Sequence, residues 1–508
     1  MPTLRAFRNS LPCILILLTA CGGGGDGQSA TTNVSVNGAS CGNTNVPSGA
    51  PGAPQNVSAI AGDQKISVNW SAPASSGGSQ VQSYVVCVLA SGNAGNDNTA
   101  IVVGTSDTQI VVQMVLGRTV IQNGTTYSVY VSATNANGTG PATVPVNVTP
   151  SAVMTSAYRP LTIRGDDSPS GIFDPSVIRS SSGTLWMSYS SVNYYADANG
   201  RLVQDVGIRL ARSDDAGGSF DFVSTIAAPE PASVTDTDPK LSACGAAVCT
   251  GRWVYETSWL VDDAGDPDAT RRFKLFAHKY FLYPAGQART LYHLGAIVMW
   301  TAASPEGKWS DPVSILGWNL TPPELMPRNL IQALHSDLAS CLASSEGGAS
   351  ATGDKLDVVL TCVYPGGDPL PQKIVLLRSA DHAKTFQYVS TLLTPEDAVA
   401  VGAKFFTAPA LVPLGKTTQA LIATPTAGAG IYAGCAVFPI ANQDIGTLVR
   451  QDGAAVTLFN IPPLADHFGG ACAWSEGLDR AGILLNDATP GQTPFATKFA
   501  ILATGRSP

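Results

Sequence analysis

Residues 253–281, WVYETSWLVDDAGDPDATRRFKLFAHKYF, decide the fold of this chain. Two apolar, aromatic-rich runs flank a polar middle that contains Gly, Asp and Pro, and this pattern predicts two β-strands joined by a hairpin. Glu256 opens the first predicted strand and His278 ends the second. The same arrangement returns four more times, in stretches that start at Phe173, His335, Phe405 and Phe468.

Five recurring units made only of strands predict an all-β protein with a five-bladed β-propeller, and six blades are the alternative. Laid over one another, the first three units carry a carboxylate at the same place: Asp174, Glu256 and Asp337. Their separations, 82 residues (256 − 174) and 81 residues (337 − 256), are nearly one period. Because equivalent positions of successive blades meet around the central axis, these acids form a candidate active site.

The composition indicates an exported protein with more than one domain. Only 13% of the 508 residues are charged, while 51 are Gly and 35 are Pro, which favours short strands and turns over helices. The net charge of −8 argues against a nucleic-acid partner, since such proteins normally present a basic face.

Residues 1–21 form a predicted targeting segment. Arg5 and Arg8 precede an apolar run that is too short to span a bilayer permanently. The run ends in Leu-Thr-Ala-Cys, which resembles the signal of bacterial lipoproteins and implies a lipid on Cys21. Gly22 after this cysteine, by the same resemblance, favours the outer membrane of a Gram-negative bacterium. Residues 22–53, rich in Gly, Ser, Thr and Asn, are expected to be a flexible tether.

Residues 54–150 resemble a fibronectin type III module, which is a two-sheet sandwich. The resemblance rests on Pro54, Trp70 and Tyr84 in the early strands and on the alternation that starts at Tyr127. The propeller then occupies residues 158–508. Residues 157–165, AYRPLTIRG, are expected to supply the missing outer strand of the last unit and thereby to close the ring.

Eight cysteines remain after Cys13 and Cys21 are set aside, an even number that fits disulfides in an oxidising compartment. Four bridges are expected: Cys341 with Cys362, Cys244 with Cys249, Cys435 with Cys472, and Cys41 with Cys87. With no CxxC or His-rich pattern and only five His, the sequence predicts no zinc site.

Two hairpins carry a further motif: residues 213–220, SDDAGGSF, and residues 379–386, SADHAKTF. They resemble the Asp-box of sialidase-type propellers, in which the aspartate ties off its own turn. Asp215 and Asp381 are therefore expected to be structural.

The five units with an Asp-Pro opening and acids on inner strands resemble the arabinanase, xylosidase and invertase group of propeller glycosidases. That family has Asp, Asp and Glu in its first three blades, whereas this chain has Asp174, Glu256 and Asp337, so only the first role carries over. The resemblance implies that Asp174 activates a water or attacks directly. From its longer side chain, Glu256 is expected to protonate the leaving oxygen.

His278, Tyr189 and Trp259 are candidate sugar contacts. The leading hypothesis is a surface-tethered glycoside hydrolase, monomeric and without a cofactor, and the presence of a structural Ca²⁺ stays open. The alternative is a catalytically inactive propeller lipoprotein that binds a glycan or a protein at the cell surface. A sialidase ranks lower, because no arginine triad for a sialic acid carboxylate is found.

Overall fold

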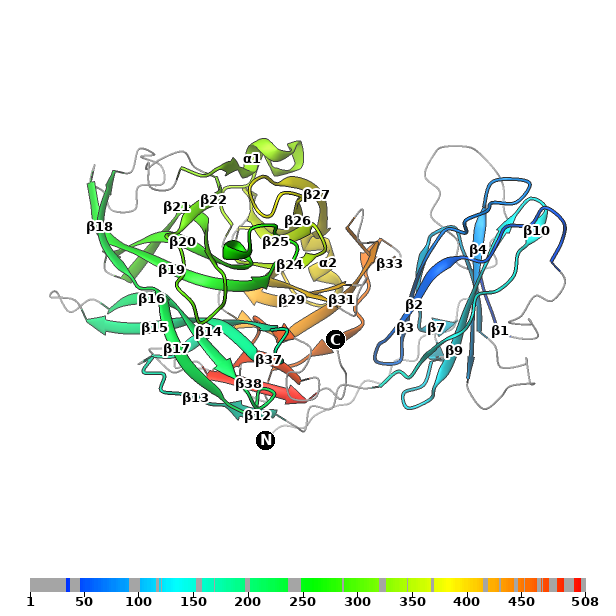
Figure 1. Cartoon of the computed structure of the whole chain (residues 1–508), viewed down its shortest axis with the longest axis horizontal. Coiled ribbons are helices and arrows are strands. Elements are labelled where there is room, and N and C mark those ends of the chain that lie inside the picture. Colours follow the sequence, from blue (N-terminus) through cyan, green and yellow to red (C-terminus); the bar gives the residue numbers. More distant parts are fainter. Residues whose placement is uncertain are drawn as a thin grey trace, which may run out of the picture.

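The computed structural model describes residues 33–36, 46–90, 101–115, 118–119, 121–151, 158–168, 170–196, 202–235, 248–285, 287–318, 326–344, 346–366, 370–413, 419–428, 431–442, 446–451, 453–463, 467, 469–474, 482–487 and 498–503. Strands form two bodies that lie side by side, a smaller N-terminal one and a larger one made by the rest of the chain (Figure 1). None of the helices in these ranges is long and apolar enough to cross a membrane. The targeting segment, Cys21 and most of the tether lie outside the described residues.

The N-terminal body is a sandwich of two antiparallel sheets. One sheet has the order β1-β5-β4-β9-β10, with β11 also on β9, and the other has the order β2-β3-β6. Trp70 and Tyr84 meet edge to face in the core, with ring centroids 5.4 Å apart. The strands are β1 (Asn33–Val36), β2 (Gln55–Ala61), β3 (Ile66–Ser71), β4 (Ser83–Ala90), β5 (Ile101–Thr105), β6 (Gln109–Val112), β7 (Met114–Val115), β8 (Arg118–Thr119), β9 (Tyr127–Asn135), β10 (Gly138–Thr139) and β11 (Val146–Val148).

Within the described residues, the larger body contains five sheets of four to six strands, called blades 1 to 5 here in chain order. Their inner strands are β14 (Ile172–Arg179), β19 (Val248–Asp262), β24 (Gly347–Thr352), β28 (Phe405–Pro413) and β36 (Ala473–Trp474). Each inner strand contacts the next, and β36 contacts β14 again, so the strands form a closed cycle. This is the arrangement of a β-propeller.

The outer strands follow each inner strand mostly as antiparallel neighbours. Blade 1 adds β15 (Leu185–Ala196), β16 (Leu202–Ser213), β17 (Phe220–Ala227) and β13 (Ile163–Arg164). Blade 2 adds β18 (Glu230–Thr235), β20 (Phe273–Ala285), β21 (Gln287–Ala302), β22 (Val313–Gly317) and β23 (Asn329–Leu330). Blade 3 adds β25 (Lys355–Val363), β26 (Gln372–Ser379) and β27 (Gln387–Leu393). Blade 4 adds β29 (Gln419–Gly428), β30 (Ile431–Tyr432), β31 (Cys435–Asn442), β32 (Thr447–Leu448) and β35 (Phe459–Ile461).

Blade 5 is completed from the other end of the propeller domain, as the sequence predicts. It adds β37 (Gly482–Asp487) and β38 (Lys498–Ala503), and β12 (Tyr158–Leu161) pairs antiparallel with β38. The segment continues into β13, which joins blade 1. Because β12 and β13 link blades 5 and 1, the first and last parts of the propeller domain hold each other in place.

Short helical turns and a small hairpin lie in the loops within and between the blades. They are η3 (Ala269–Arg271), α1 (Ile331–Leu334), η5 (Ser336–Leu338), α2 (Pro395–Ala400), β33 (Arg450–Gln451) and β34 (Ala454–Ala455).

The stretch at residues 253–281 forms the expected hairpin, with β19 and β20 joined by a polar loop that contains η3. Its strands are longer than predicted: Glu256 lies in the middle of β19 and pairs with His278 in the middle of β20. The pairing register shifts between Glu256 and Ser258, so Thr257 forms a bulge.

Similar bulges shape the inner strands of other blades. Asp174, Thr257, Ala408 and Ala471 all have a positive φ, between 43° and 51°, which is unusual for residues with a Cβ. Three of their N–H groups donate to a side chain of the second strand in the preceding blade: Asp174 to Asn486, Thr257 to Ser190, and Ala471 to Thr424. The bulges therefore bind neighbouring blades together where the strands face the axis.

Two of the expected disulfides are present, Cys341–Cys362 within blade 3 and Cys435–Cys472 between blades 4 and 5. Cys87 and Cys249 are also disulfide-bonded. Their expected partners, Cys41 and Cys244, lie outside the described residues.

Candidate active site

Asp174 is the buried centre of a group of acids on three adjacent inner strands. Only 8% of its surface is exposed. Thr257 Oγ1 donates to Asp174 Oδ2 at 3.0 Å, and Ser190 Oγ does so at 3.4 Å. These donors come from blades 2 and 1, so the bulge of the neighbouring blade helps to hold the carboxylate in place.

Glu256 lies one residue before the bulge of β19 and is partly exposed. The hydroxyl of Tyr280, on the paired strand β20, donates to Glu256 Oε2 at 2.7 Å. Since Glu256 and Tyr280 belong to the same blade, the orientation of this carboxylate is set within one sheet.

Glu346, directly before β24, is the third acid and is also partly exposed. Its carboxylate accepts two hydrogen bonds from blade 4: the N–H of Ala408 at 2.6 Å to Oε2 and the hydroxyl of Tyr432 at 3.0 Å to Oε1. Thus the fourth N–H of the bulge positions also has a side-chain acceptor, here a carboxylate that would otherwise be solvated.

Burial raises the pKa of all three acids, by different amounts. The pKa of Asp174 is raised to about 6 by burial, against hydrogen bonds from Thr257 and Ser190. Burial and then the charge of Asp174 raise the pKa of Glu256 to about 7. The same two causes raise that of Glu346 to about 8, and the charge of Glu256 adds to them. Because the charge of Asp174 raises the pKa of each glutamate, the protonation states of the three carboxyl groups are coupled.

Asp337, the third acid expected from the sequence, does not belong to this group. It lies in η5, its side chain is 54% exposed, and it accepts a hydrogen bond from Tyr388 Oη on the outer strand β27. The inner strand of blade 3 begins only at Gly347, after α1, η5 and Cys341. This insertion lengthens the spacing from Glu256 to 90 residues (346 − 256), so a constant period selects the wrong acid.

One signal in the sequence points to Glu346. Glu346 comes directly before Gly347, the first residue of the short strand that pairs with Lys355–Val363. The pairing of this strand in the structure, and not the repeat length, identifies the first residue of the inner strand.

The three residues expected to contact sugar are buried. Tyr189 is fully buried, and its hydroxyl donates to Asp166 at 3.0 Å. Because neighbouring residues of a strand point to opposite faces, Tyr189 and Ser190 lie on different faces of β15. Trp259 is 2% exposed and stacks on Phe276. His278 is fully buried, with its ring centroid 4.8 Å from that of Tyr280. Their side chains pack within the propeller, whereas Tyr280 and Tyr432 touch the acids.

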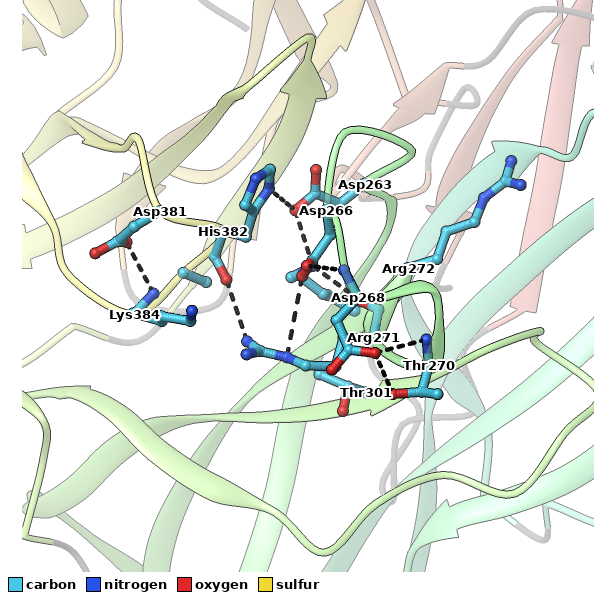
Figure 2. A network of polar contacts seen from close by, with 12 residues as sticks. Asp263, Asp266, Asp268, Thr270, Arg271, Arg272, Thr301, Asp381, His382 and Lys384 are labelled. Atoms are coloured by element: carbon cyan, nitrogen blue, oxygen red, sulfur yellow. Dashed lines mark hydrogen bonds and ion pairs between the residues drawn. The ribbon is translucent and has the colours of Figure 1, made fainter.

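A second charged cluster joins blades 2 and 3 away from the acids (Figure 2). Asp263, Asp266 and His382 lie close enough together to hold a metal ion. However, the fully buried ammonium of Lys274 is 2.8 Å from a carboxylate oxygen of each aspartate, and His382 Nδ1 is 3.0 Å from Asp263. Lys274 and Arg271, whose Nε lies 4.0 Å from Asp266, together balance the charge of the two carboxylates, so this cluster is a structural link between the blades.

The turn that contains His382 belongs to one of the two motifs noted in the sequence. Asp381 accepts hydrogen bonds from the N–H and the hydroxyl of Thr385, and Asp215 accepts the same pair from Ser219. Both aspartates tie off their own turns, as expected for structural residues.

Comparisons with known proteins match the two bodies separately. The family model of the fibronectin type III domain matches residues 52–149. Among solved structures, a thermostable family-43 glycoside hydrolase is 11% identical, covers 67% of this chain and 90% of its own, and has a TM-score of 0.38. An arabinanase from Bacillus subtilis is 11% identical, with 65% and 94% covered and a TM-score of 0.36. The structure of a Hadza microbial sialidase is 12% identical, with 91% of this chain and 90% of the sialidase covered and a TM-score of 0.38.

A search of curated protein sequences found no match. The chain is an all-β protein in which a fibronectin type III domain precedes a propeller-like domain that is similar, at low identity, to glycoside hydrolases.

Proposed function

We propose that the propeller hydrolyses a glycosidic bond of an extracellular glycan through Asp174, Glu256 and Glu346. The observation that carries the proposal is the grouping of three carboxyl groups on adjacent inner strands, with pKa values spread from about 6 to about 8. Glycoside hydrolysis needs one ionised and one protonated carboxyl group across the scissile bond, and such a spread supplies both near neutral pH.

The spread also assigns the roles. Asp174, with the lowest pKa of the three, is the base that takes a proton from the attacking water. Glu346, with the highest, is protonated at neutral pH and donates its proton to the leaving oxygen. Burial and the charge of Asp174 keep the pKa of Glu346 high, and the charge of Glu256 adds to their effect. The acid is thus Glu346, where the sequence alone favours Glu256.

Substitution of the acids tests this proposal on a panel of aryl glycosides and of plant and microbial glycans. We expect Asp174→Asn and Glu346→Gln each to lower kcat/KM by about 10²–10⁴, the contribution typical of general acid–base catalysis. Asp337→Asn is the matched control, because Asp337 is an exposed acid of the same blade as Glu346, and it is expected to retain wild-type activity. Unchanged turnover in both site variants would assign the chemistry to other residues.

The pH dependence gives a second readout of the same experiment. Activity is lost below about pH 6, where Asp174 becomes protonated, and above about pH 8, where Glu346 loses its proton. The profile of kcat/KM is therefore a bell centred near pH 7. Absence of turnover on every substrate, together with measurable glycan binding, would favour the inactive glycan-binding propeller instead.

The location is part of the proposal. The mature protein is tethered to the outer membrane through a lipid on Cys21, and residues 22–32, which precede β1, give it reach. This follows from the charged, apolar and cysteine-terminated order of residues 1–21.

A further inference from the structure

All five inner strands enclose a narrow channel along the propeller axis. Its lining is dominated by small residues, among them Gly348, Ala349, Ala410 and Ala473. The cavity measures about 50 Å³. Since one bound water occupies roughly 10–15 Å³ by this measure, the channel has room for a few waters but not for a sugar ring.

Three residues of the channel lining each carry a buried polar side-chain atom that has no hydrogen-bond partner within the described part of the chain. They are Ser258 Oγ, Trp259 Nε1 and Trp474 Nε1. The three side chains are 3%, 2% and 6% exposed. A buried donor without a partner costs roughly 1–3 kcal/mol, so native proteins usually satisfy such groups with bound water.

The chemistry of these groups selects the occupant. An indole N–H only donates a hydrogen bond, and therefore needs an oxygen lone pair or an anion opposite it. Two such donors do not suit a metal cation, which would require oxygen ligands at these positions. Water accepts from an indole N–H and donates onward to the next group, so it fits both the donors and the size of the channel.

Asp174 connects this channel to the acid group. It is the one ionisable side chain among the described residues that line the channel, and its charge is also sensed by Glu256 and Glu346. A water at the end of the channel therefore meets the carboxylate to which the preceding section assigns the role of base.

We propose that the axial channel holds a column of bound water that ends at Asp174 and supplies the water consumed in hydrolysis, an inference that rests on the proposed function. The water oxygen bonds to the anomeric carbon as the glycosidic C–O bond breaks. Its proton passes to Asp174, while Glu346 gives its proton to the leaving oxygen. A proton from solvent restores Glu346, Asp174 releases its own, and the next water of the column moves forward.

Occupancy is tested first, by a high-resolution crystal structure of the full chain. We expect ordered waters within hydrogen-bond distance of Trp259 Nε1 and Trp474 Nε1, and one at Asp174. A dry channel, or a channel filled by an ion, would overturn the proposal whether or not the protein is a hydrolase.

The supply of water through the channel is tested by narrowing the channel with Ala349→Leu. The matched control is Ala351→Leu on the same strand: both alanines are half-buried and pack against the same core cluster, but only Ala349 lines the channel. We expect Ala349→Leu to lower kcat at least tenfold, with KM and both limbs of the pH profile unchanged, and Ala351→Leu to behave like the wild type. If Ala349→Leu fails to fold, as judged by thermal unfolding, the smaller change Ala410→Val takes its place.

Other outcomes of this experiment contradict the supply of water through the channel. An unchanged kcat in the narrowed channel would mean that the water arrives from the substrate side. A lower kcat accompanied by shifted pH limbs would mean that the substitution acts through Glu346, three residues away. If the wild type turns over no glycan although the crystal contains the water column, the proposed function is wrong. The supply of water for hydrolysis is then wrong too, and only the presence of bound water in the channel is confirmed.

Discussion

At the scale of the residue, the three acids of the candidate site lower the stability of the folded protein. Burial disfavours the ionised forms of Asp174, Glu256 and Glu346, and the charge of Asp174 further raises the pKa of both glutamates. Hydrogen bonds from Thr257, Tyr280 and Tyr432 offset part of that cost. Such an arrangement is typical of functional sites, because a structural role would be served better by uncharged side chains.

This cost predicts a pH-dependent stability. The pKa of Glu346 is about 8 in the folded protein, above its ordinary value of 4.5, so the folded state retains a proton that the unfolded state releases. The contribution of the protonated Glu346 to the free energy of unfolding is fully present below about pH 4.5 and is lost as the pH rises through 8. Glu346→Gln removes this loss, so we expect the variant to gain roughly 1–3 kcal/mol over the wild type between about pH 5 and about pH 9.

Urea unfolding at several pH values measures this difference. Asp337→Asn serves as the control, since its carboxylate is exposed and its substitution removes the same charge from the chain. Parallel stability curves for Glu346→Gln and the wild type would contradict the prediction.

At the scale of the element, close contact between inner strands decides the width of the axial channel. A Cβ built on Gly348 of β24 would lie 2.7 Å from Ala410 Cα and 2.7 Å from the carbonyl oxygen of Pro409, both on β28. Both atoms belong to the backbone, so no side chain can move aside. Glycine is therefore required where these two blades meet.

Gly348→Ala is expected to push β24 away from β28 and to lower the free energy of unfolding by roughly 1–3 kcal/mol, the usual cost of overpacking. Thermal unfolding of the full chain measures this effect. Gly52→Ala is the control, because a Cβ there would meet no atom closer than 3.7 Å. Equal stability of the two variants would show that β24 and β28 tolerate a wider spacing.

At the scale of the whole molecule, the fibronectin type III domain is docked against blade 4 of the propeller (Figure 1). Lys65 Nζ donates to the carbonyl oxygen of Thr457 at 2.8 Å, and the N–H of Asp63 donates to that of Leu458 at 3.2 Å. Ile60 packs against the core cluster formed by blades 4 and 5. The two domains contact each other through several groups. A lipid anchor on the N-terminal side would therefore hold both domains at the membrane.

The proposed anchor is tested on this whole assembly. We expect Cys21→Ser to move the protein from the membrane fraction to the soluble periplasmic fraction, because the lipid can no longer be attached. Cys13→Ser is the matched control, since Cys13 lies in the segment that is cleaved off, and it should leave the membrane association intact. A Cys21→Ser protein that stays with the membrane would contradict lipidation at this residue.

The sequence by itself determined the β-rich units and the closing strand, and it named two of the three acids of the candidate site. Alternating residues such as Tyr127, Val129 and Val131 form a buried face wherever a strand is half covered, so the local pattern is sufficient to identify the strand. The pairing of β12 with β38 was also predictable, because an incomplete last unit leaves an edge that must be covered. Asp174 and Glu256 were predicted because each lies in a strand that the local apolar pattern identifies.

Only the tertiary structure decided the third acid and the surroundings of all three. The insertion with α1 and η5 displaces the inner strand of blade 3, and no local pattern reports how far. The partners of Glu346, Ala408 and Tyr432, lie 62 and 86 residues away along the chain, and the raised pKa values arise from burial that exists only when the blades close. Which acid is exposed and which is desolvated depends on contacts between distant segments, and a linear pattern does not contain them.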